Sequence, residues 1–170
     1  MKKLCFTFLI LAVTASSVLM GQYGRQQAGL RMGYRGGIFY QVARDAGNAE
    51  IAYNAMLGFS NNGIQLTGLK IIYETSINKI SPDLFFAWGY GGHVGFVNTD
   101  HLGFFGERYN FNGERLCPVL GVDGWLAAEY RFRHIPLNIS LNLKPFIEFM
   151  IPSFLRLMPV DLGLSVSYVF

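Results

Sequence analysis

The segment that decides the fold is residues 161–170, which reads Asp161-Leu162-Gly163-Leu164-Ser165-Val166-Ser167-Tyr168-Val169-Phe170. Apolar side chains occupy every even position and end in two aromatics. The odd positions up to Ser167 carry only Asp, Gly or Ser. Because successive side chains of a β-strand point to opposite faces, this pattern predicts a strand with one apolar and one polar face.

The same alternation recurs upstream. It is found in residues 30–40, 51–59, 84–96, 122–132 and 137–144. Residues 64–75 change phase, because Gln65 and Thr67 share one parity while Lys70 and Glu74 share the other. We expect a β-bulge near Gly68 to restore a single apolar face there.

The composition restricts the class of protein. Charged residues make up 15% of the chain and aromatic residues 15%, and there are 20 glycines. A soluble domain carries about 25% charged residues. No run of 18 apolar residues follows the N-terminal segment, which argues against membrane-spanning helices. Hydrophobicity spread over alternating strands is typical of a transmembrane β-barrel. A soluble β-sandwich is the weaker alternative, since it must hide all these apolar faces in one core. The 14 basic residues are scattered, so no nucleic-acid partner is expected.

The first residues have the organisation of a signal peptide. Lys2 and Lys3 precede an apolar stretch, residues 4–13, and small residues follow. We predict a cleaved signal peptide over residues 1–21 and a barrel domain over residues 22–170. Cleavage after Ser17, an uncleaved anchor and a buried N-terminal helix are the alternatives. Cys117 is then the single cysteine of the mature chain, which leaves no internal disulfide.

Turn residues give a provisional topology. Asn61-Asn62-Gly63 and His134-Ile135-Pro136 predict short turns, and we place both on the periplasmic side, where barrels have short turns. The count then requires a fifth strand over residues 102–111. The result is an all-β, eight-stranded antiparallel up-and-down transmembrane barrel with both termini periplasmic. The longer loops are expected at residues 42–48, 78–83, 112–118 and 151–160.

Several segments resemble a known family. Gly163 to Phe170, Gly91 to Phe96, Gly121 to Gly124 and Ile135 to Leu141 resemble small OmpA/OmpX-like outer-membrane barrels of Bacteroidetes, within the porin superfamily. The resemblance implies a place in the outer membrane of a Gram-negative bacterium, in contact with its lipids. It also implies that the barrel-assembly machinery reads the C-terminal strand, at Leu164, Val166, Tyr168 and Phe170.

The inward parity collects charged groups. We expect a structural polar network in the lumen, made of Arg31, Arg35, Lys70, Glu74, His93, Asp123, Glu129, Arg131, Lys144 and Glu148, with Asp161 beside it. An Arg or Lys on the lipid face near the midplane costs about 2–4 kcal/mol. Charges that pair inside an eight-stranded barrel can fill its narrow lumen.

We therefore predict a monomer with a plugged lumen. Its role is either structural or the binding of partners through external loops. The external loops are the expected place for an extracellular ligand, and the apolar residues Phe154, Leu155, Leu157 and Met158 are candidate contacts of the outer leaflet or a partner. One alternative is a narrow porin-like channel lined by Arg31, Arg35 and Glu129. The other is a lipid A-modifying enzyme, but His93, His101 and His134 lack the partner spacing of a catalytic or metal site. We expect no catalytic residues, no metal and no cofactor.

Overall fold

The computed structural model describes residues 25–46, 49–60, 62–74, 81–104, 107–150, 154–158 and 160–170, of which the side chains of 99–115 and 154–158 are not described. The predicted signal peptide and its cleavage site lie outside these ranges. No helix in the described ranges is long and apolar enough to cross a membrane.

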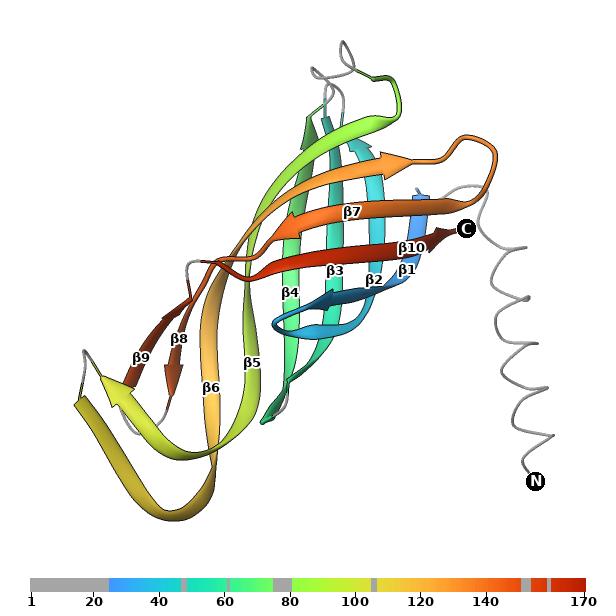
Figure 1. The fold of residues 1–170 in the computed structure, drawn as a ribbon. Coiled ribbons are helices and arrows are strands. Elements are labelled where there is room, and N and C mark those ends of the chain that lie inside the picture. The colour runs from blue at the N-terminus through green and yellow to red at the C-terminus, as the bar shows by residue number, and fades with distance from the viewer. Residues whose placement is uncertain are drawn as a thin grey trace, which may run out of the picture.

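The described residues form one antiparallel sheet (Figure 1). Its strands are β1 (Arg25–Gly33), β2 (Gly36–Ala46), β3 (Ala49–Ser60), β4 (Gly63–Glu74), β5 (Leu84–Phe104), β6 (Glu107–Arg131), β7 (Leu137–Leu143), β8 (Phe146–Met150), β9 (Phe154–Met158) and β10 (Leu162–Val169).

These segments make eight barrel strands, because two of the eight are interrupted. β7 and β8 pair with β6 in one continuous register, with Leu143 opposite Leu126 and Ile147 opposite Val122. The interruption falls at Pro145, which has no N–H to donate, although its carbonyl still accepts a bond of 2.8 Å from Gly124 N–H. β9 and β10 form the other interrupted strand.

The sheet closes on itself. β1 pairs with both β2 and β10, β10 pairs with β7, and β5 pairs with both β4 and β6. Neighbouring strands are antiparallel and follow chain order around the ring. The predicted eight-stranded up-and-down barrel is therefore confirmed.

Two strand assignments from the sequence are wrong. One of them treats two strands as one and the other adds a strand, so the total of eight is unchanged. The segment 30–40 is a hairpin, since β1 ends at Gly33 and β2 begins at Gly36. In the β1–β2 register Arg31 lies opposite Gly37, so inward side chains have odd numbers on both strands and the alternation runs through the turn without a break. The separate fifth strand over 102–111 does not exist, because β5 continues to Phe104 and β6 begins at Glu107.

The predicted sidedness and loops change accordingly. The predicted turn after β3 lies at the end away from both described termini, where Ser60 of β3 is opposite Gly63 of β4, whereas the 132–136 connection joins β6 to β7 at the terminal end. The two turns lie at opposite ends of the barrel and cannot both be periplasmic. Of the expected loops, 42–46, 112–118 and 154–158 are strand, and 78–80 lie outside the described residues.

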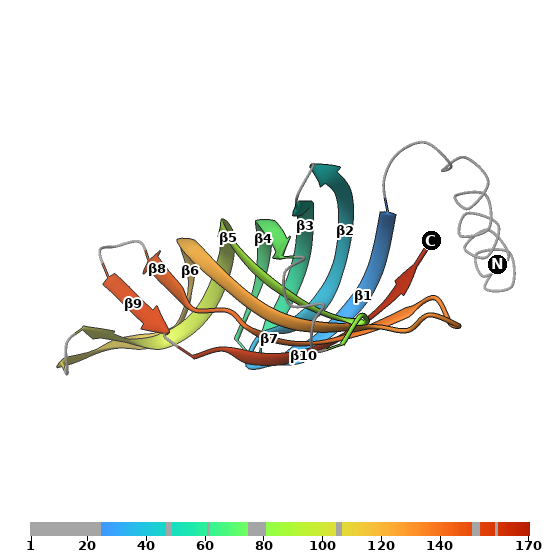
Figure 2. The same cartoon turned by 90° about the horizontal axis from the view of Figure 1, so that it is seen from above.

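Beyond the ring, the sheet continues as an extension. β5 runs past Val97, the last residue that pairs with β4, and remains paired with β6. On the other side of β6, β8 pairs with residues 119–123, where its Glu148 still faces the lumen, and β9 pairs with β8. Figures 1 and 2 show these four strands projecting from the end opposite the C-terminus.

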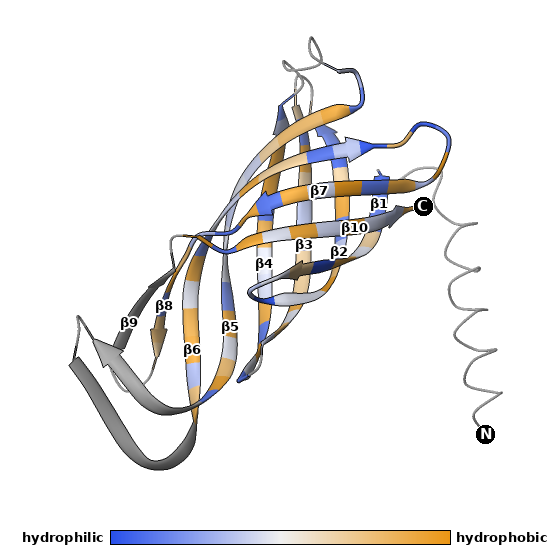
Figure 3. Ribbon diagram, in the orientation of Figure 1, coloured by the Kyte–Doolittle hydropathy of each residue, from blue (hydrophilic) through white to orange (hydrophobic). Residues whose placement is uncertain are grey.

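The two faces of the wall differ in polarity, as the alternating colours along the coloured strands in Figure 3 indicate. Outward side chains are apolar and exposed: Leu164 is 41% exposed, and Leu30, Leu120 and Val122 are each 59% exposed. Arg31, at 2% exposure, and Lys144, at 0%, are buried inside. The hydrophobic surface therefore faces away from the chain's own core.

Candidate functional site: the charged interior of the barrel

Arg31 is the most completely bonded side chain of the interior. Its Nε donates to Asn142 Oδ1 at 2.7 Å, and its two terminal nitrogens donate to both Asp161 carboxylate oxygens at 3.2 Å. The same two nitrogens also donate to the carbonyls of Arg35 and Asp161 at 2.7 and 3.0 Å. A guanidinium has five N–H donors, and here all five are used. Arg31 therefore holds strands together and has no donor left for a solute.

A second cluster surrounds His93 on β5. Its Nδ1 lies 2.8 Å from Asp123 Oδ2, and its Nε2 lies 3.3 Å from Glu148 Oε2. Lys144 Nζ donates to the other Asp123 oxygen at 2.5 Å, and Arg35 donates to both Glu148 oxygens at 2.9 and 3.1 Å. The five side chains form a continuous chain through the lumen, with Lys144 and Arg35 at its ends and the His93 ring between the two carboxylates.

The charges in these two clusters balance. Three fixed cations, Arg31, Arg35 and Lys144, accompany three carboxylates, those of Asp123, Glu148 and Asp161. Buried ions are tolerated when they are paired and their remaining donors and acceptors are bonded, and this interior meets both conditions.

Near the terminal end lies a third group, built around Arg131. Its Nε donates to Glu129 at 2.7 Å and its terminal nitrogens donate to the two Glu50 oxygens at 3.0 and 3.1 Å. Arg25 also pairs with Glu50, at 2.5 Å. Tyr73 O–H donates to Glu129 at 3.0 Å and lies beneath the Arg131 guanidinium, 4.6 Å from ring centroid to Cζ.

Between these charged layers the lumen is filled by a small apolar cluster. Leu69, Ile71 and Ala52 pack there with Trp125, and the Arg31 Cζ lies 5.8 Å from the Trp125 ring. A cavity of about 20 Å³ remains, lined by Gln27, Asn54, Trp125 and neighbouring serines. A water molecule needs about 10–15 Å³ of such space, so this cavity holds about one.

The structure corrects two predicted lumen residues, Lys70 and Glu74. β4 pairs with β3 and β5 in an unbroken register through Gly68, so the expected bulge is absent. The inward residues of β4 are Gln65, Thr67, Leu69, Ile71 and Tyr73. Lys70 and Glu74 point outward instead, and Trp88 Nε1 donates to the exposed Glu74 at 3.2 Å. Polar residues do change parity within this strand. The cause is that the inner face of β4 becomes apolar at Leu69 and Ile71, while the strand itself continues without a bulge.

The other predicted lumen residues share the interior: Arg31, Arg35, His93, Asp123, Glu129, Arg131, Lys144 and Glu148. Leu164 and Tyr168 of the predicted assembly signal are exposed on the outer face, and Val166 and Phe170 are half-buried. Among the other two histidines considered for chemistry, His134 is exposed at the terminal end, and the side chain of His101 is not described.

Sequence reasoning missed several partners in this network. Arg25 was overlooked because residues 25–29 lack the apolar alternation that marked the other strands, and Glu50 was seen only as a polar position of its strand. Asn142 and Tyr73 were missed because a search for charges passes over neutral groups. The signal that could have found Asn142 was its inward parity beside Lys144.

Comparisons with known proteins bear on the fold. No protein-family model matches the chain, and no curated protein matches it. Among solved structures it is similar to the N-terminal β-barrel domain of Pseudomonas aeruginosa OprF, with a TM-score of 0.53 and 11% sequence identity. The match covers 86% of this chain and 96% of that one. The chain has the OprF barrel fold. At this identity the likeness extends to the fold alone.

Proposed function

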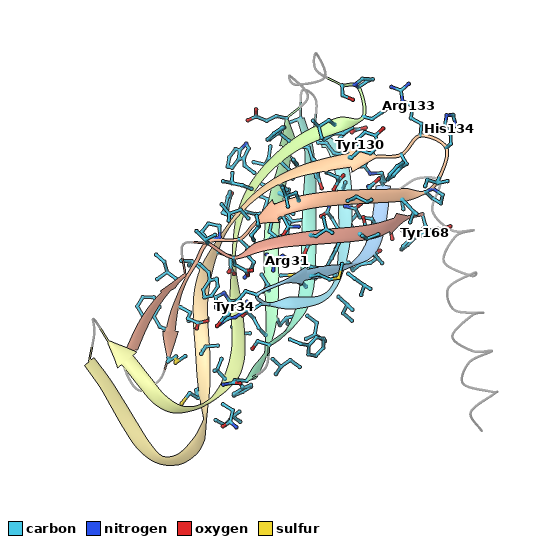
Figure 4. The ribbon with its side chains drawn as sticks, viewed as in Figure 1. Arg31, Tyr34, Tyr130, Arg133, His134 and Tyr168 are labelled. Carbon is cyan, nitrogen blue, oxygen red and sulfur yellow. The ribbon has the colours of Figure 1, made fainter. Side chains whose placement is uncertain are left out.

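We propose that this protein is an integral barrel of a Gram-negative outer membrane, with a closed interior that serves as a rigid scaffold. The observation that carries the proposal is the exposed apolar band on the outer face. Monomeric soluble proteins seldom expose more than a few hundred Å² of contiguous apolar surface, whereas a lipid-facing wall requires it. Outward aromatic residues gather at the terminal end, where Figure 4 shows Tyr130 and Tyr168, and Tyr34 marks the other end.

The two tryptophans offer a direct test of the lipid-facing assignment. Trp88 is 42% exposed on the outer face, whereas Trp125 is 8% exposed inside. We expect brominated phospholipids to quench Trp88 fluorescence strongly in Trp125→Phe and to leave Trp125 fluorescence nearly unchanged in Trp88→Phe. Equal quenching of the two variants would refute the membrane assignment.

The proposed scaffold role, in place of conduction, follows from the interior. Every donor of Arg31 is occupied, and Glu148 and Asp123 are bridged by His93. A narrow channel is the second candidate, because the cavity beside Trp125 has room for water between the charged layers. Recordings in planar bilayers separate the two.

We also propose that the protein is not an enzyme and that partners bind at the four-stranded extension of β5, β6, β8 and β9. Both ring nitrogens of His93 face carboxylates, which leaves neither to activate a nucleophile. Lipid A should therefore keep an unchanged mass spectrum when the protein is overproduced.

Binding of partners at the extension is proposed because the rigid ring carries it, which is the usual arrangement of a binding surface.

A further inference from the structure

A pocket of about 350 Å³ opens at the terminal end of the barrel, next to the group built around Arg131. It lies between the 132–136 connection, the start of β1 and the end of β10. Its walls include Arg25, Arg131, Arg133, His134, Ile135 and Val169. Sites for small molecules commonly enclose about 300–1,000 Å³, so this pocket is large enough for a small ligand.

The charged residues lining this pocket are all basic. Three of them have carboxylate partners, since Arg25 pairs with Glu50, Arg131 with Glu50 and Glu129, and Arg133 with Asp83. None of these carboxylates lines the pocket. The pocket therefore presents cations to its contents, with the balancing charges set behind them.

The arginines retain donors. Arg131 engages each of its nitrogens with a carboxylate, which uses three of its five N–H donors. Arg25 makes one ion pair, and its buried Nε has no hydrogen-bond partner. Arg133 donates to Asp83 through Nε, and its side chain is 59% exposed. Figure 4 shows Arg133 and His134 together on the connection at this end.

We propose that this pocket binds a small oxyanion, a phosphate or carboxylate group attached to a short apolar portion. The planar guanidinium fork matches the geometry of both oxyanions. The apolar part would pack against the walls formed by Phe132, Ile135, Pro136, Leu137 and Val169. The proposal is independent of the membrane assignment, because it concerns only the residues around the pocket.

The test is a titration of the full chain, folded in dodecyl maltoside micelles, which contain no phosphate, with butyl phosphate. The readout is the arginine side-chain N–H signals in ¹⁵N NMR. We expect saturable shifts at Arg25 and Arg133. Removal of one charge-assisted donor should weaken binding about tenfold in Arg133→Gln and, separately, in Arg25→Gln. Arg44→Gln is the matched control, because Arg44 is an exposed arginine near the end of β2 that does not line the pocket.

Further arms distinguish the sources of the anion. Weaker binding of inorganic phosphate than of butyl phosphate would support the role of the apolar walls, and saturable acetate binding would extend the site to carboxylates. If nanodiscs containing phosphatidylglycerol, but not phosphatidylcholine, reproduce the shifts and block butyl phosphate, the ligand is a lipid headgroup. Linear shifts without saturation, or equal weakening by Arg44→Gln, would overturn the proposal.

Discussion

Gly121 of β6 lies directly against the ring of His93 on β5. A Cβ placed on Gly121 would stand 2.3 Å from His93 Cε1 and 2.6 Å from the carbonyl oxygen of Ile147. Real Cβ atoms do not approach other heavy atoms so closely, so a side chain at this position is incompatible with the observed ring. The absence of a side chain at Gly121 therefore leaves the room that the His93 ring needs to reach its two carboxylates.

We therefore expect Gly121→Ala to displace His93 and to lower the free energy of unfolding by about 1–3 kcal/mol, the usual cost of overpacking. Urea unfolding of the micelle-embedded protein measures this change. Gly68→Ala is the control, because nothing lies within 4 Å of a Cβ at that outward position. Equal effects of the two substitutions would contradict the proposed role of Gly121.

Removal of the Arg31 guanidinium should be more costly. Arg31→Met leaves the fully buried Asp161 without its cation, and we expect a loss of about 3–5 kcal/mol in the free energy of unfolding. The double variant Arg31→Met, Asp161→Leu removes both charges and should regain a large part of that loss. Arg133→Gln, which breaks an exposed pair, should leave the unfolding midpoint unchanged. A single variant as stable as the wild type would show that the buried pair contributes little.

Substitution by Met should change the stability of the barrel in opposite directions at Lys144 and at Lys70. Lys144 is buried against Asp123 inside, so Lys144→Met should destabilise the barrel by about 3 kcal/mol. Lys70 lies on the outer face between Tyr53 and Tyr90 of the neighbouring strands. Lys70→Met should stabilise the protein in bilayers by about 1–2 kcal/mol, because a lipid-facing lysine is unfavourable. Stability in lipid vesicles as a function of urea checks both signs, and a loss at Lys70 would argue against its outward position.

Conduction is tested in planar bilayers. We expect no discrete current steps from the wild-type protein in concentrated KCl, because ion pairs and Trp125 occupy the lumen. A pore-forming barrel inserted under the same conditions serves as the positive control. Reproducible single-channel steps from this protein would favour the narrow channel.

Much of the fold could be predicted because side-chain parity is a local property of the sequence. The alternation at residues 162–170 places Leu164 and Ser165 on opposite faces wherever the strand lies in the barrel. The hairpin at Tyr34 and Arg35 could not be seen in this way, because inward side chains have odd numbers in both β1 and β2. Residues 102–111 were misassigned because strand length and hairpin position depend on distant pairing partners, which a local pattern does not contain.

The candidate site was predictable only where charge and parity agreed. Arg31, Asp123 and Lys144 are charged and lie at inward positions, so their burial followed from the pattern. Lys70 and Glu74 failed because the inner face of β4 is apolar at Leu69 and Ile71, which reverses the usual relation between polarity and face. Which charges meet across the lumen depends on the strand register, and a local sequence pattern does not reveal that register.

The bonds of Arg31 have a consequence for how the cylinder is completed. They join Arg31 of β1 to Asn142, which is 111 residues further along the chain, and to Asp161, which is 130 residues further. Contacts between such remote positions form late, since they carry the largest loop-closure cost. Pairing of β1 with β10 closes the seam and brings the Arg31 guanidinium to its carboxylate partner, so completion of the ring and neutralisation of this cation occur together.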